Sequence, residues 1–140
     1  MAQDKPLREG VSPETDELAS TLMGAALDLL AAGEPFEVLL AVQDGAGAVS
    51  SLEFEDDGPE ACLDGARERV RASEGAVRYA IAYEGAVEVE GGGYSDAVLL
   101  EFGERGYRAY SAYSLVDGKG AGDRFTWTDP APAGEMEPLL

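Results

Sequence analysis

The sequence predicts an α+β fold in two layers, with a mostly antiparallel sheet of about six or seven strands and two helices on one face. Two segments combine helix-start signals with apolar residues at helical spacing. Several others alternate apolar and polar residues, as half-buried strands do, and short glycine-containing turns separate them. Because such short connections make neighbouring strands antiparallel, we expect the order α-β-β-α-β-β-β-β-β in a single domain spanning residues 1–140.

Both expected helices have proline in the first turn, where its missing N–H costs nothing. The first has Ser12 as its N-cap and Gly33 at its C-terminal end. The second begins at Pro59 and ends before Gly75. The apolar residues that we expect to face the sheet are Leu18, Leu22, Leu29, Leu63 and Val70.

The segment 77–115 organises the expected sheet and is predicted to form a four-stranded meander. Residues 84–85 are interpreted as its first hairpin turn, because glycine accepts the positive φ of such turns, and residues 103–106 as its last. Between these turns, the run 97–100 is apolar at every position, which is typical of a central strand that is buried on both faces.

An earlier hairpin and a short late strand complete the expected sheet. The hairpin joins residues 36–42 to residues 48–55, and the late strand lies around residues 124–128. Residues 1–11 lack periodicity and are expected to form a loose arm. Residues 129–140 contain three prolines and are expected to form an extended tail along the surface.

The charge balance limits the possible partners. The chain has 28 acidic and 10 basic residues, a net charge of −18, so nucleic acid and anionic membranes are not expected as partners. No apolar run approaches the roughly 18 residues of a membrane span, and the N-terminus lacks the apolar core of a secretory signal. The single cysteine, Cys62, suits a reducing compartment, so we expect a cytoplasmic protein.

The acidity itself has several explanations that the sequence leaves open. It is compatible with an ordinary soluble surface, with adaptation to high salt, with mimicry of DNA, or with an acidic functional site.

The residue types that are absent exclude several kinds of chemistry. Without histidine, the chain has no Ser-His or Cys-His pair, no imidazole base and no zinc site with histidine ligands. A single cysteine also excludes thiolate clusters. Residues 91–93 are followed by a strand rather than a helix and are not a phosphate loop, and residues 117–123 lack the ligand pattern of a calcium loop. We therefore expect neither a metal site nor a cofactor.

Candidate catalytic residues gather around the expected central strand. Asp96 and Glu101 flank it, and their five-residue spacing places them on opposite faces. Glu104 and Arg105 follow at the strand end and complete the candidate set. The alternative is a structural role, in which Glu101 pairs with Arg105 or Glu104 pairs with Arg108.

Aromatic residues supply a second candidate surface. Such residues are used both in sheet cores and at partner surfaces, so the two interpretations stay open. The candidate binding residues are Tyr107, Tyr110, Tyr113 and Trp127. Cys62 lies among acidic residues that oppose thiolate formation, and we interpret it as a buried structural residue.

Residues 79–113, YAIAYEGAVEVEGGGYSDAVLLEFGERGYRAYSAY, carry one family resemblance. The part DAVLLEFGERG resembles a hairpin of small uncharacterised bacterial proteins. The resemblance covers about a quarter of the chain, and it implies no activity and no catalytic residue.

The function that we expect is that of a non-enzymatic protein-interaction module acting as a homodimer. The expected central strand is apolar on both faces while two helices cover one face, so a second copy would bury the remainder. If instead the sheet curls into a half-barrel, the tail and Trp127 would close the second face. One alternative function is a small carboxylate-dependent enzyme or ligand-binding protein with its site at the end of the central strand. Another is an acidic inhibitor of a basic partner.

Overall fold

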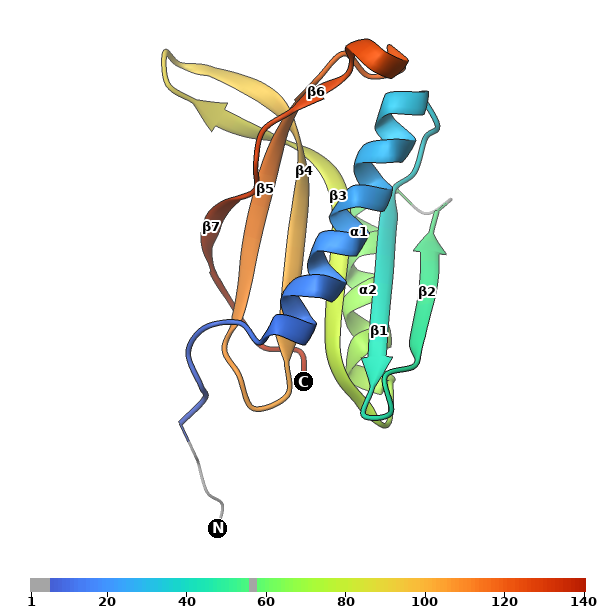
Figure 1. Cartoon of the computed structure of the whole chain (residues 1–140), viewed down its shortest axis with the longest axis vertical. Helices are drawn as coiled ribbons and strands as arrows, with labels where there is room; N and C mark the ends of the chain where they lie inside the picture. Colours follow the sequence, from blue (N-terminus) through green and yellow to red (C-terminus); the bar gives the residue numbers. More distant parts are fainter. Residues whose placement is uncertain (1–5, 56–57) are drawn as a thin grey trace.

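The computed structural model describes residues 6–55 and 58–140, and it confirms the α+β class and the predicted order of helices and strands (Figure 1). The elements are α1 (Pro13–Ala32), β1 (Val38–Asp44), β2 (Val49–Phe54), α2 (Pro59–Ala72), β3 (Ala76–Val89), β4 (Gly93–Glu104), β5 (Ala109–Asp117), the short 3₁₀ helix η1 (Gly122–Arg124), β6 (Thr126–Trp127) and β7 (Ala131–Met136).

The strands form one antiparallel sheet in the order β2-β1-β3-β4-β5, with β6 and β7 pairing with opposite ends of β5. The sheet curls into a half-barrel. None of the helices in the described part of the chain has the length and apolar character needed to cross a membrane.

The two helices lie on opposite faces of the sheet, so the prediction that both cover one face is wrong. α1 packs on a cluster that includes Leu39 and Ala41, whereas α2 packs on Val38 and Leu40, their neighbours in β1. Successive side chains of a strand point to opposite faces, and here both sets are apolar. β3 repeats the pattern, with Ala80 and Ala82 toward α1 and Tyr79 and Ile81 toward α2. Each face of these central strands therefore needs its own helix.

The turn predicted at residues 84–85 is not present. β3 runs unbroken through 14 residues, and Gly85 pairs with Ala97 of β4. The hairpin closes instead at Gly91 and Gly92, whose φ angles are 94° and 81°. Gly85 allows a close approach, because a Cβ built on it would lie 2.5 Å from Cδ1 of Leu99. The glycine of residues 84–85 therefore serves packing rather than chain reversal.

The C-terminal tail is more ordered than predicted. Ala131–Met136 forms β7 along β5, where an edge strand tolerates proline. The chain then returns to the α2 face, where Leu139 and Leu140 pack against the cluster under α2. The strand expected around 124–128 is reduced to the two residues of β6 after η1. The two strands predicted on either side of residues 84–85 are the single strand β3, whereas the tail contributes β7 as an additional strand. The number of strands therefore matches the prediction.

The N-terminal arm is partly fixed. The Arg8 amide donates to the carbonyl of Gly106, and the Arg8 carbonyl accepts from the amide of Arg108. Residues 6–11 therefore attach to the β4–β5 turn, contrary to the expected loose arm, while residues 1–5 of that arm lie outside the described part.

Candidate functional site

Glu101, the most buried of the candidate carboxylates, is held by two partners on the α2 face of the sheet. Its side chain is almost fully enclosed, and its two oxygens accept hydrogen bonds from Nη2 and Nε of Arg67 at 2.5 and 3.1 Å. The Tyr83 hydroxyl donates to the same carboxylate at 2.8 Å. Burial, together with the negative charge of Glu101, raises the pKa of Tyr83, and the hydrogen bond to Glu101 raises the pKa of Arg67. Tyr83 and Arg67 therefore stay protonated, and the three side chains tie α2 to the sheet.

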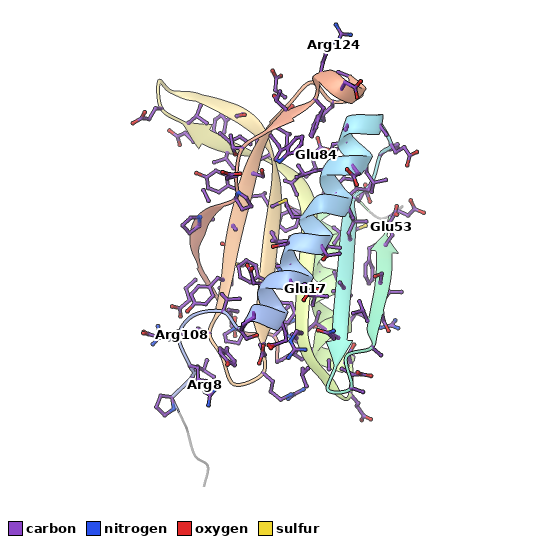
Figure 2. All side chains as sticks on the ribbon, viewed as in Figure 1. Arg8, Glu17, Glu53, Glu84, Arg108 and Arg124 are labelled. Carbon is purple, nitrogen blue, oxygen red and sulfur yellow. The ribbon has the colours of Figure 1, made fainter. Side chains whose placement is uncertain are left out.

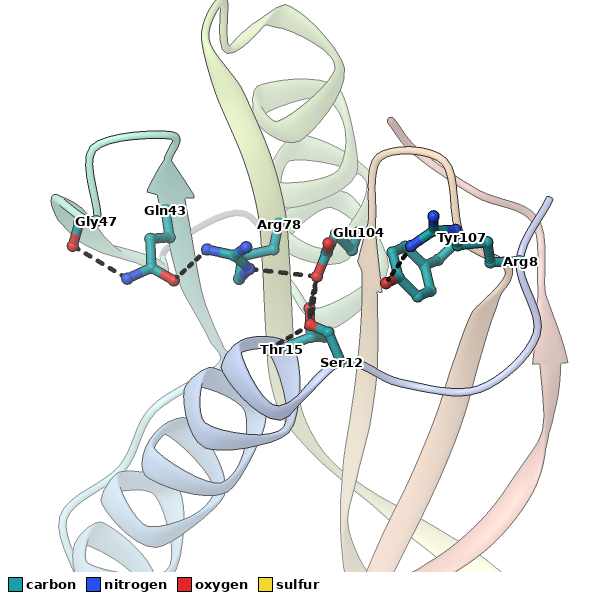
Figure 3. A network of polar contacts seen from close by, with 8 residues as sticks. All are labelled: Arg8, Ser12, Thr15, Gln43, Gly47, Arg78, Glu104 and Tyr107. Carbon is teal, nitrogen blue, oxygen red and sulfur yellow. Dashed lines mark hydrogen bonds and ion pairs between the residues drawn. The ribbon is translucent and has the colours of Figure 1, made fainter. Parts of the chain in front are cut away.

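Glu104 lies on the opposite face and joins the start of α1 to the sheet (Figure 3). Ser12, the N-cap of α1, donates to its carboxylate at 2.5 Å, Thr15 donates at 2.6 Å, and Arg78 donates through Nε at 3.4 Å. Arg78 also donates to Gln43 of β1 at 2.8 Å. Partial burial acts to raise the pKa of Glu104, but the hydrogen bonds and the charge of Arg78 outweigh it, so the pKa is lowered. Glu104 is therefore held as a carboxylate.

The other two candidates lie apart from this pair. Arg105 donates twice to the carbonyl of Ala76, at 2.9 and 3.3 Å. Asp96 is exposed near the other end of β4, 3.8 Å from Nζ of Lys119. Asp96 and Glu101 do face opposite sides, as their spacing predicts, because the pairing of β4 with β3 is regular between them.

The ion pairs that were expected near the strand end do not form. Glu101 pairs with Arg67 and Glu104 with Arg78, while Arg108 pairs with Glu135 of β7 at 3.0 Å. The four candidate catalytic residues therefore do not converge on one place.

Two of the four candidate aromatic residues fasten the N-terminal arm. The hydroxyl of Tyr107 accepts from Nη1 of Arg8 at 3.2 Å, and the hydroxyl of Tyr110 accepts from the Gly10 amide at 2.9 Å. Tyr113 pairs with Leu99 and faces away from Tyr110.

Trp127 remains exposed although its ring contacts the core. It stacks on Phe125 with ring centroids 6.0 Å apart, yet 57% of its surface is accessible. Cys62 is buried, with its Sγ 3.0 Å from Oε2 of Glu37, in agreement with a structural role.

A groove that sequence reasoning missed runs along α1 above β1 and β2. α1 packs mainly across β3 and β4, and β2 has no helix on this face, so its residues Val49, Ser51 and Glu53 stay exposed. Two adjoining hollows, of about 400 and 560 Å³, share Leu22, Ala25 and Ser51 in their walls. We call this continuous depression the α1–β2 groove. The apolar lining residues on the α1 face of the sheet are Leu18, Leu22, Ala25, Leu29, Leu39, Ala41 and Val49.

Carboxylates surround this apolar lining. Figure 2 labels Glu17 on α1 and Glu53 on β2, one on each wall of the groove. The carboxylates among the lining residues are Glu14, Glu17, Asp28, Glu34 and Glu53. Within the described part of the chain, none of the five takes part in an ion pair or a side-chain hydrogen bond, unlike Glu101 and Glu104.

The acidic character of the groove has a signal in the sequence. Residues 9–66, which include α1, β1 and β2, contain 14 of the 28 acidic residues and none of the 10 basic ones. A run of 58 residues without lysine or arginine would have located an acidic face, although it could not have located the hollow.

The described residues include no group of three or more His, Cys, Asp or Glu side chains that could hold a metal ion. Comparison of the chain with family models, with curated proteins and with solved structures gives no significant match. The function therefore has to be inferred from the geometry of the chain itself.

Proposed function

We propose that this chain is a non-enzymatic protein-interaction module, acting in the cytoplasm, and that the α1–β2 groove is its contact surface. One observation carries the proposal. The groove has an apolar lining, of which Ala25 and Val49 are exposed, and it lies beside β2, which no helix covers on this face; within the described residues the carboxylates around it form no ion pair. Apolar concave surfaces with a polar rim are what protein partners commonly occupy.

The alternative of a carboxylate-dependent enzyme receives less support. A catalytic carboxylate has to reach its substrate, whereas the carboxylates of Glu101 and Glu104 accept hydrogen bonds from side chains of the protein. The two residues also lie on opposite faces of the sheet. Arg105, the candidate cation, is likewise engaged by the carbonyl of Ala76.

Self-association is a second candidate, favoured by exposed aromatic residues far from the groove. Tyr94, at the start of β4, is 75% exposed, and Trp127 of β6, at the opposite end of the strand order from β2, is 57% exposed. The acidic groove would repel its own copy, so we propose the aromatic end as the homodimer contact. Sedimentation at micromolar concentration tests this contact. A dimer that Trp127→Ser dissociates would support it, and a monomer throughout would contradict it.

Site-specific cross-linking tests the groove. A photoreactive residue at Ala25, which is exposed inside the groove, should cross-link to a partner in the cells that make the protein. The same residue at Ser20, exposed on α1 outside the groove lining, is the matched control. We expect a cross-link from position 25 only, abolished by Thr21→Trp, which fills the groove. Equal products from both positions, or none from position 25, would contradict the proposal.

A further inference from the structure

We infer that the occupant of the α1–β2 groove is a cationic amphipathic α-helix of a partner protein, about four turns long. This inference rests on the proposed function and specifies the chemistry of the partner.

The length of the groove sets the length of the occupant. The residues of α1 that line it begin at Glu14 and end at Leu29, with spacings of three and four that keep them on one flank of the helix. At 1.5 Å per residue this flank is about 22 Å long, which is the length of a 15-residue helix.

The width of the groove suits a helix. Its open floor is β2, because Leu39 and Ala41 of β1 are already buried beside α1. β2 lies two strand spacings, about 10 Å, from β3, on which α1 packs, and a helix is about 10 Å in diameter. Helices that pack side by side have axes about 8–10 Å apart. A helix laid on this floor would therefore contact α1 along its length and continue the layer that α1 begins.

The charges around the groove specify the polar face of that helix. Glu14, Glu17 and Asp28 stand on the α1 side, and Glu53 stands on the β2 side. A neutral helix would cover these carboxylates without offering partners, which costs free energy. Lysine or arginine on both flanks of an apolar stripe would pair with them while their methylene stems add apolar contact.

A second copy of this chain does not offer such a helix. α1 contains no basic residue. The basic residues of α2 include Arg67, which is bound to Glu101, and the apolar face of α2 is already packed on its own sheet. The occupant has to come from another protein.

Synthetic peptides test this inference directly. The probe is a 15-residue helix with leucines at positions i, i+3, i+4 and i+7 and lysines elsewhere. The first control replaces every lysine with glutamate, and the second keeps the composition but alternates leucine and lysine as a strand would. Binding is measured by NMR chemical-shift changes and by titration. We expect the cationic helix to shift the resonances of Leu22, Ala25 and Ser51 and the other two peptides to bind at least tenfold more weakly.

Charge-reversal variants separate the groove from the overall charge of the protein. The double variant Glu17→Lys with Glu53→Lys should weaken binding of the cationic helix at least tenfold. Glu88→Lys with Glu90→Lys, two exposed positions on β3 and its turn, changes the net charge equally and should weaken it less than threefold.

The possible outcomes distinguish this inference from the proposed function. Equal weakening by both double variants would reduce the binding to general attraction and overturn the inference. Equal binding of the glutamate peptide would overturn the charge requirement, and preferred binding of the alternating peptide along Val49–Phe54 would replace the helix with an added strand. If no peptide shifts the groove resonances, the cationic helix is overturned, whereas the cross-link from position 25 still decides the proposed function.

Discussion

Arg67 and Glu101 form a two-point contact between α2 and β4, with N–O distances of 2.5 and 3.1 Å. The carboxylate of Glu101 is enclosed, whereas the guanidinium of Arg67 keeps 28% of its side-chain surface exposed. A charge taken out of water costs free energy that only a close partner offsets. The stability of the α2 layer therefore depends on this contact more than on any surface ion pair of the same helix.

Arg67→Met should lower the free energy of unfolding by about 3 kcal/mol, because it leaves the Glu101 carboxylate buried with Tyr83 as its remaining donor. Arg71→Met is the matched control, since Arg71 pairs with Glu68 at the surface of the same helix and should cost less than about 1 kcal/mol. Urea unfolding measures both. Adding Glu101→Gln to Arg67→Met should recover part of the loss. Equal effects of Arg67→Met and Arg71→Met would contradict a buried, coupled pair.

Glu104→Gln should flatten part of the dependence of stability on pH. The folded-state pKa of Glu104 lies below the ordinary 4.5, so the folded protein binds this proton less tightly than the unfolded chain does. The stabilisation is therefore fully present above about pH 4.5 and is lost as the pH falls through the folded-state pKa.

The difference in unfolding free energy between the native chain and Glu104→Gln should be about 1–2 kcal/mol at neutral pH and should shrink in acid. Glu88→Gln, at an exposed position, controls for the general loss of negative charge. A difference that stays constant from neutral pH into acid would show that Glu104 does not stabilise as a carboxylate.

Gly103→Ala should destabilise the protein by about 1–3 kcal/mol through overpacking. The added Cβ would lie 2.9 Å from the hydroxyl oxygen of Tyr79 and 3.1 Å from Cβ of Ala109, and Tyr79 is too enclosed to move aside. Gly85→Ala meets only Leu99, which is half-buried and can rotate, so it should change stability by less than about 1 kcal/mol. Thermal unfolding of the two variants compares them, and a reversed order would contradict this view of the sheet.

Replacing both Leu139 and Leu140 with serine should lower the free energy of unfolding by about 2 kcal/mol, since both side chains are partly buried against the α2-side cluster. Burial raises the pKa of Tyr79 to about 12, so opening this region should also move that pKa back toward 10. Ultraviolet titration of tyrosinate measures the shift. Glu137→Ser, an exposed change just before the two leucines, should leave both quantities unchanged.

The sequence was most informative where structure is local. Ser12 caps α1 and Gly33 ends it with a left-handed φ of 75°, as predicted, because these signals act within one helical turn. Gly85 misled for the same reason. In sequence, a glycine needed for a turn looks the same as a glycine that leaves room for a side chain such as Leu99. The two are distinguished by the pairing of β3 with β4, which continues beyond Gly85.

The candidate site depended on contacts that local patterns do not encode. Arg67 lies 34 residues before Glu101, and Ser12 lies 92 residues before Glu104. Their spacing predicted that Asp96 and Glu101 lie on opposite faces, but it could not identify the hydrogen-bond partners of Glu101 and Glu104. The α1–β2 groove exists because α1 lies over the central strands β3 and β4 and leaves the edge strand β2 uncovered on this face, which is a property of packing between elements far apart in the chain.

Both ends of α1 are attached to residues from the last third of the chain. Glu104 accepts from Ser12 and Thr15 at its start, and the amide of Gly120 donates to Leu30 near its end at 2.8 Å. A ribosome that adds roughly 5–20 residues per second needs about 5–18 s to pass from Ser12 to Glu104. During that interval Leu18 and Leu22 have no β4 to cover them. α1 is therefore an element whose docking has to wait until β4 and the segment around Gly120 have been synthesised.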